Sequence, residues 1–255
     1  MFAIGGDPGV YLQNDIDRYF PNVGLLVNGE DPNGTTTFTD RGPKAYAQTT
    51  ATNIRNTSTN FKMGLGSIYA TGTNASVTFA STTTWANLST RTFTFESWVY
   101  ITTWVTTNKN VDLSTGGGGA LPNVNINNDF GGSNVWFGIT TGAATIQANI
   151  GVANSATVLS TGVWHHLCIQ KNSTSSASST ATTDFYWDGV KFPTTTGGAW
   201  SSSASAQTMT VGRSDGAAHA SKYIDDYRWT MDVVRYPGSP DTIPVPDRPL
   251  PTMPG

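Results

Sequence analysis

The feature that most constrains this 255-residue chain is a set of short segments in which side chains alternate between two faces. In segment 93–101 the odd-numbered positions are mainly apolar, whereas the even-numbered positions carry Thr, Glu, Trp and Tyr. Successive side chains of a β-strand point to opposite faces, so this pattern predicts a strand. Large side chains on both faces indicate a strand near the centre of a sandwich.

Further segments of the same kind recur along the chain, separated by turns rich in Gly, Asn and Ser. They are residues 135–139, 145–150, 163–170, 183–187 and 208–213. Asp188-Gly189 predicts a tight type I′ hairpin, because both central residues of that turn need positive φ. No segment reads as an amphipathic helix. We therefore predict an all-β fold, a two-sheet antiparallel sandwich, and a single domain, since sandwiches commonly reach this length.

Composition excludes several classes of function. Charged residues make up only 12% of the chain and its net charge is −3, with no Lys/Arg cluster, so we expect no nucleic-acid binding. No segment approaches the roughly 20 apolar residues that span a bilayer. The first residues lack the basic and apolar regions of a signal peptide. We expect a soluble protein without membrane insertion, in which the single cysteine, Cys168, is a buried apolar residue.

The two ends differ from the middle. Residues 1–20 have few periodic apolar positions and are predicted to form an N-terminal arm, followed by the sandwich at 21–236. Residues 237–255 contain seven prolines and are predicted to be an extended tail, used as a spacer or as a strap on a partner surface. We expect both ends to attach the protein to an assembly. The alternative is an arm that folds back on its own sandwich and a mobile tail.

Five motifs occur in an order that is typical of one family. They read Asn33-Gly-Thr-Thr-Thr-Phe-Thr-Asp40, Phe93-Thr-Phe-Glu-Ser-Trp-Val-Tyr100, Trp164-His-His-Leu-Cys-Ile169, Phe185-Tyr-Trp-Asp-Gly189 and Tyr223-Ile-Asp-Asp-Tyr-Arg-Trp-Thr-Met-Asp-Val-Val-Arg-Tyr236. This series resembles the laminin-G-like modules, which are jelly-roll sandwiches of the concanavalin A type. The resemblance covers roughly residues 23–236 and implies such a jelly roll with extended N- and C-terminal segments.

No catalytic set is visible. Glucanases related to this sandwich carry a Glu-x-Asp-x-(x)-Glu pattern on one strand, which directs the acid and the nucleophile into one cleft. The only glutamates here are Glu30 and Glu96, and Glu96 matches a position where we expect a structural, hydrogen-bonded carboxylate. His165 and His166 point to opposite faces, and His219 is the only other histidine, so a zinc site is not expected. We predict that the protein is not an enzyme and needs no cofactor.

Calcium is the one metal that the resemblance allows, because some laminin-G-like modules bind it at the rim of the sandwich. Asp225 and Asp226 are the candidate ligands, with Asp112, Asp129 and Asp215 as partners in rim loops. The alternative is structural: strand alternation turns one of the two aspartates inward, where it accepts hydrogen bonds from loop amides.

Tryptophans outside the clear strands are candidates for stacking on sugar rings. They are Trp85, Trp104 and Trp200. Core packing is the alternative, since sandwiches of this size bury many tryptophans.

The opening Leu-Leu-x-Asn-Gly…Phe-Thr-Asp and the closing Ile-Asp-Asp-x-Arg…Val-Arg-Tyr most resemble modules in virion proteins of tailed phages. This resemblance implies a non-enzymatic structural protein on the virion surface, made in the host cytoplasm, as a capsid decoration or a tail-fibre component. Its expected partners are other virion proteins and copies of itself in a homo-oligomer. The alternative is a carbohydrate-binding adhesin domain for host glycans.

Overall fold

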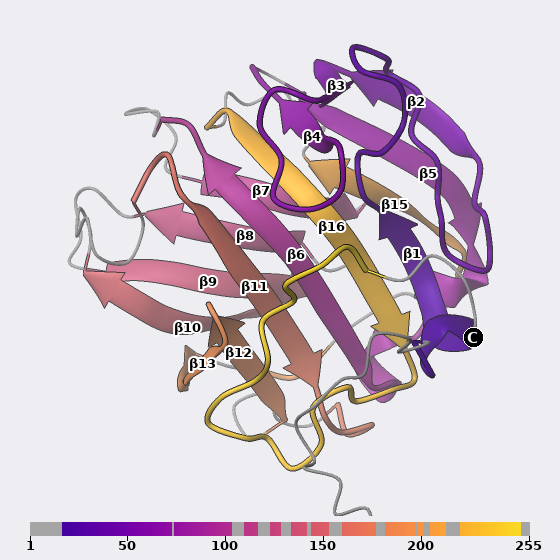
Figure 1. Ribbon diagram of the computed structural model, residues 1–255. Coiled ribbons are helices and arrows are strands. Elements are labelled where there is room, and N and C mark those ends of the chain that lie inside the picture. The colour runs from indigo at the N-terminus through magenta and orange to yellow at the C-terminus, as the bar shows by residue number, and fades with distance from the viewer. Residues whose placement is uncertain are drawn as a thin grey trace, which may run out of the picture.

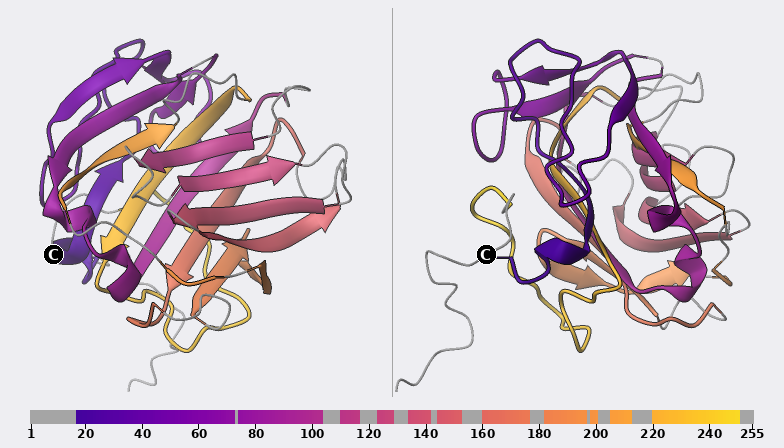
Figure 2. Two further views of the ribbon diagram at one scale, coloured as in Figure 1. Left: turned by 180° about the vertical axis from the view of Figure 1, so that it is seen from behind. Right: turned by 90° about the vertical axis from the view of Figure 1, so that its right-hand side faces the viewer.

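The computed structural model describes residues 17–72, 74–103, 110–116, 123–128, 134–141, 144–152, 160–176, 182–196, 198–200, 205–212 and 220–250. These residues form two antiparallel sheets that pack face to face (Figure 2). The helical elements among them are short 3-10 turns, η1 (Phe20–Asn22), η2 (Thr83–Trp85) and η3 (Leu88–Thr90). The predicted all-β sandwich is confirmed. No helix in the described ranges is long and apolar enough to cross a membrane.

The first sheet, sheet A, contains most of the family motifs and faces the viewer in Figure 1. Its strands run in the order β13 (Val190–Phe192), β12 (Thr183–Trp187), β11 (Trp164–Lys171), β6 (Phe93–Ile101), β16 (Lys222–Met231), β4 (Ser67–Ala70) and β3 (Ile54–Thr57). The short strand β1 (Val23–Val27) pairs with the C-terminal half of β16. The first and last strands of the domain therefore lie side by side.

The second sheet, sheet B, lies behind sheet A. Its order is β14 (Thr194–Thr196), β10 (Ala144–Val152), β9 (Asn134–Thr141), β8 (Asn123–Asn128), β7 (Asn110–Gly116), β15 (Gln207–Gly212), β5 (Ser76–Thr82) and β2 (Gln48–Thr52). The chain passes from β2 in sheet B to β3 in sheet A through one residue, Asn53, with φ +50°. Asn tolerates this left-handed conformation better than most residues, which suits it to the corner.

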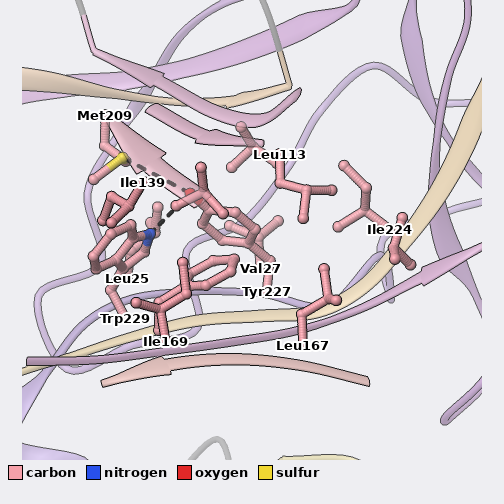
Figure 3. Close-up of a cluster of buried hydrophobic side chains, with 14 of the residues drawn as sticks. Leu25, Val27, Leu113, Ile139, Leu167, Ile169, Met209, Ile224, Tyr227 and Trp229 are labelled. Carbon is pink, nitrogen blue, oxygen red and sulfur yellow. Dashed lines mark hydrogen bonds between the residues drawn. The ribbon is translucent and has the colours of Figure 1, made fainter. Parts of the chain in front are cut away.

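The core lies between the sheets and is built from large apolar side chains of both (Figure 3). Tyr227 and Trp229 on β16 are buried there together with Met209 on β15. The indole N–H of Trp229 donates to the hydroxyl of Tyr227 at 2.8 Å, and that hydroxyl donates to the sulfur of Met209 at 3.8 Å. Buried Tyr and Trp need such partners for their polar atoms. The chain of contacts ties sheet A to sheet B.

Every strand segment predicted from alternation is present, as β6, β9, β10, β11, β12 and β15. The predicted hairpin at Asp188-Gly189 is also confirmed, because both residues have positive φ, +49° and +80°. The amide of Asn172 donates to the carbonyl of Thr182 at 2.9 Å, which extends the hairpin between β11 and β12 beyond the strands. The tip of that hairpin lies outside the described residues.

The tail does not stand away from the sandwich. Residues 232–250, which we call the C-terminal strap, cross the outer face of sheet A (yellow in Figure 1). The amide of Ile243 donates to the carbonyl of Gly189 at 2.8 Å, and Thr242 forms a β-bridge with Val190. Leu250 is buried against Phe20 and neighbouring residues of β1. These residues are therefore neither a free spacer nor a mobile tail, because Ile243 and Asp241 form backbone hydrogen bonds with the hairpin of β12 and β13.

The remaining parts of the two ends, residues 1–16 and 251–255, lie outside the described residues.

Candidate functional site

Four aromatic side chains form a continuous row across neighbouring strands on the outer face of sheet A. Tyr69 on β4 is paired with Tyr223 on β16, Tyr223 with Tyr100 on β6, and Tyr100 with Trp164 on β11. Successive ring centroids are 4.7, 5.6 and 5.6 Å apart. All four side chains are partly exposed. We call these four residues the aromatic row.

The row follows from strand geometry. The residues adjacent in sequence to the three tyrosines are Ile68, Ile224 and Ile101, and all three are buried in the core. Period-2 alternation therefore turns the tyrosines outward. Aromatic side chains are well suited to pleated, half-buried surfaces and to cross-strand contacts. Burial, and then the neighbouring tyrosines, raise the pKa of Tyr223 above its ordinary value. Its hydroxyl therefore stays protonated and can donate a hydrogen bond at neutral pH.

Two cationic side chains flank the row. Arg55 on β3 is paired with Tyr69, and its guanidinium carbon lies 4.8 Å from the centre of that ring. The ammonium of Lys62 lies 4.4 Å from the ring centre of Trp98, which is two residues before Tyr100 on β6. Both cations are exposed residues.

Lys62 belongs to the loop of residues 58–66, which crosses the outer face beside the row (Figure 1). The carboxylate of Asp225 accepts hydrogen bonds from the amides of Lys62 and Met63 at 2.9 and 3.0 Å. The indole of Trp164 donates to the side-chain oxygen of Asn60 at 3.2 Å. The loop is thus fastened at the row, and its neighbouring side chain Phe61 is 41% exposed.

The other half of the same face is closed by the C-terminal strap and holds a buried charge cluster. Glu96 is 1% exposed and accepts hydrogen bonds from Arg228 and from the hydroxyl of Tyr236, both at 2.5 Å. Asp17 accepts from Arg228 at 3.2 Å and from Arg235 at 2.7 Å. Burial raises the pKa of Glu96, but the two guanidinium groups outweigh that effect and hold it at about 2. Glu96 is a structural, hydrogen-bonded carboxylate, as expected from its motif.

Residues 71–234, more than half of the chain, match the family model Laminin_G_3, described as the concanavalin A-like lectin/glucanases superfamily. The chain belongs to this family. No curated protein sequence matches it closely enough to count as a relative.

Solved structures with a similar fold include binding domains of a mosquitocidal protein and of botulinum neurotoxin. The binding domain of Paraclostridial Mosquitocidal Protein 1 is similar with a TM-score of 0.57 at 10% identity, over 86% of this chain and 51% of that chain. The binding domain of botulinum neurotoxin DC in complex with SialylT gives 0.55 at 12% identity, over 83% and 48%. The same domain in complex with rat synaptotagmin II gives 0.56 at 13%, over 83% and 48%. The chain spans about half the length of these structures, and the likeness concerns the fold.

The tryptophans predicted to stack on sugars are placed elsewhere. Trp85 is 0% exposed and packs edge-on against Trp229, and Trp200 is 3% exposed and packs edge-on against Phe93. Core packing, the alternative, is what the structure has at both positions, and neither ring has a face open to a sugar. Trp104 lies outside the described residues. The four rings of the aromatic row lie instead within strands, so a prediction restricted to tryptophans outside the strands does not include them.

The candidate calcium ligands are already occupied by backbone amides. Asp225 is held by the loop amides described above, as the structural alternative expected, and Asp226 accepts from the amide of Leu250 at 2.9 Å. Strand alternation alone does not predict the direction of the Asp226 side chain, because β16 has a bulge against β6 at this position and Asp226 has φ +46°.

Burial raises the pKa of both carboxyl groups of this pair. Asp129, Asp215 and the side chain of Asp112 lie outside the described parts of the chain. Within those parts no group of three His, Cys, Asp or Glu side chains is placed to hold a metal ion.

Proposed function

We propose that the chain is a non-catalytic carbohydrate-binding domain and that the aromatic row is its sugar-binding surface. The observation that carries this proposal is the partly exposed run of four aromatic rings on a lectin-family sandwich. Ligand sites combine apolar and aromatic surface with a few polar groups that orient the ligand. Here the rings supply apolar faces for the C–H groups of a sugar, and the tyrosine hydroxyls supply hydrogen bonds for its hydroxyls.

Other features agree with binding through this half of the face. The opposite half is covered by the C-terminal strap, whereas Phe61 in the loop beside the row and Val163, the residue before Trp164, are exposed. Exposed apolar groups that gather on one surface are typical of interaction sites. One toxin domain with a similar fold was solved in complex with SialylT, which is consistent with a sugar-binding role for such sandwiches.

The absence of catalysis is part of the proposal and rests on the two glutamates. A general acid needs a raised pKa and access to the glycosidic oxygen. Glu96 has neither, because ion pairs hold its pKa at about 2 beneath the strap. Glu30 accepts a hydrogen bond from the amide of Leu65 at 2.8 Å, and the only other glutamate of the chain is Glu96.

Binding to a panel of immobilised oligosaccharides tests the proposal. Tyr100→Ala and Trp164→Ala should each reduce affinity at least tenfold while the melting temperature shows that the fold is kept. Val190→Ala is the matched control, since Val190 is also exposed and apolar but lies on β13, away from the row. Unchanged binding in both row variants, or no binding of any sugar by the wild type, would contradict the proposal.

We also propose that this domain is displayed on a phage virion, as a capsid decoration or as part of a tail fibre or adhesin, assembled with other virion proteins as a homo-oligomer. The sequence motifs at its opening and close support this location, and a sugar-binding face is consistent with attachment to a host. The neighbouring genes test it. A major capsid gene beside this one would support a capsid decoration, and tail genes would support an adhesin. The absence of both kinds of gene from the neighbourhood would count against both roles.

A further inference from the structure

The two cations beside the aromatic row have no carboxylate partner among the described residues. The guanidinium of Arg55 lies over the ring of Tyr69, and the ammonium of Lys62 lies over the ring of Trp98. By contrast, Arg41, Arg91, Lys191, Arg228 and Arg235 are all ion-paired. Arg55 and Lys62 are the cations beside the row, and neither forms an ion pair with a described carboxylate, in a chain of net charge −3.

The nearest described carboxylates are occupied elsewhere. Asp225 is buried beneath the 58–66 loop and accepts hydrogen bonds from loop amides. Glu30 reaches the far end of the same loop, where it accepts from the amide of Leu65. Neither carboxylate forms an ion pair with Arg55 or Lys62, so the two cations beside the row are open to an anionic ligand.

We infer that the row binds an oligosaccharide that carries carboxylate groups, with Arg55 and Lys62 as the residues that select the negative charge. This inference rests on the proposed sugar-binding function. A guanidinium presents a planar fork of donors that matches a carboxylate, whereas an ammonium acts as a compact charge. Stacking on Tyr69 holds the guanidinium at the end of the row and leaves its N–H groups at the edges of the plane.

The size of the surface favours a chain over a single sugar. Arg55, the four aromatic residues and their five strands follow one another in the order β3, β4, β16, β6 and β11. At about 4.8 Å between neighbouring strands, Arg55 and Trp164 are roughly 20 Å apart. An oligosaccharide laid across the strands contacts the rings in turn and places acidic groups near Arg55 at one end and Lys62 along its side.

Calorimetric titration of the full chain with matched oligosaccharides tests the inference. The probes are oligogalacturonate, the neutral oligogalactan of the same length, and a sulfated form of that galactan. We expect tighter binding of the uronate, a loss of at least tenfold for that probe in Arg55→Gln and in Lys62→Gln, and weaker binding at high salt. Arg248→Gln is the control, since its side chain is exposed and lies on the strap.

The other outcomes overturn the inference in distinguishable ways. If galactan binds as tightly as the uronate and Arg55→Gln changes neither, while Tyr100→Ala abolishes both, the sugar-binding proposal stands and the acidic selectivity is wrong. A preference for the sulfated probe assigns the cations to sulfate rather than carboxylate. If no probe binds and Tyr100→Ala converts a dimer to a monomer in sedimentation, the row is a self-association surface and both proposals fail.

Discussion

Replacing Glu96 by Gln removes one negative charge from the buried cluster beneath the strap and changes almost nothing else in the shape of the side chain. Glu96 lies on β6, and its carboxylate accepts hydrogen bonds from Arg228 and Tyr236 at 2.5 Å. Arg235 lies within 3.6 Å of the same carboxylate. The substitution leaves two guanidinium groups to share the single carboxylate of Asp17 in a site with little access to water.

The size of the effect can be worked out from the pKa of Glu96, which the folded protein lowers from 4.5 to about 2. Each pKa unit corresponds to about 1.4 kcal/mol, so the charged form of Glu96 stabilises the fold by about 3 kcal/mol at neutral pH. Breaking a buried ion pair by removing one partner typically costs about 3–5 kcal/mol. For a domain of this size that loss lowers the melting temperature by roughly 6–12 °C.

Thermal and urea unfolding at pH 7 and at pH 2.5 measure this effect. The folded pKa of Glu96 lies below the unfolded value, so its stabilisation is present above about pH 4.5 and is lost as the pH falls to about 2. The gap between wild type and Glu96→Gln should therefore be wide at pH 7 and narrow at pH 2.5. Asp247→Asn is the control, because that carboxylate is 84% exposed and should contribute nothing measurable.

A melting temperature within 2 °C of the wild type at pH 7 would refute the reasoning. It would mean that the cluster relaxes around a neutral side chain and that the ion pairs contribute no net stability. A large gap that persists unchanged at pH 2.5 would also refute it, because the loss would then come from packing rather than charge.

Three further predictions concern the strap, the buried aspartates and calcium. Leu250→Ala should destabilise the fold by about 2 kcal/mol in urea unfolding, because Leu250 is buried against Phe20. An unchanged free energy of unfolding would mean that the strap is not fixed at this point. Burial raises the pKa of Asp225 to about 8, so the folded wild type binds more protons than the unfolded chain. Its free energy of unfolding should therefore fall, relative to that of Asp225→Asn, as the pH rises from about 4 to 8. A difference between the two proteins that does not depend on pH would contradict this. The melting temperature should be the same in millimolar calcium and in a chelator, because Asp225 and Asp226 already accept hydrogen bonds from backbone amides. A clear rise of the melting temperature in calcium would contradict this prediction.

The sequence by itself determined the local structure and the fold class. Alternation in 93–101 places Glu96 and Tyr100 on one face of the strand and Phe93 and Phe95 on the other, because strand geometry alternates whatever the strand pairs with. Asp188-Gly189 specifies its own turn through the φ values that these residues tolerate. Such features depend on neighbours within a few residues, and the structure has them as predicted.

Only the tertiary structure decided which residues of one face meet. Tyr69 and Tyr223 lie far apart in the sequence and become partners because β16 enters the sheet between β6 and β4. In the same way, Asp17 reaches Arg228 and Arg235 across more than 200 residues, since the first and last strands are neighbours. A composition rich in proline predicted a tail without structure of its own, but the free edge of β13 decided where it binds. Strand order is set by how the two sheets bury their apolar faces together, and no short segment of the sequence carries that information.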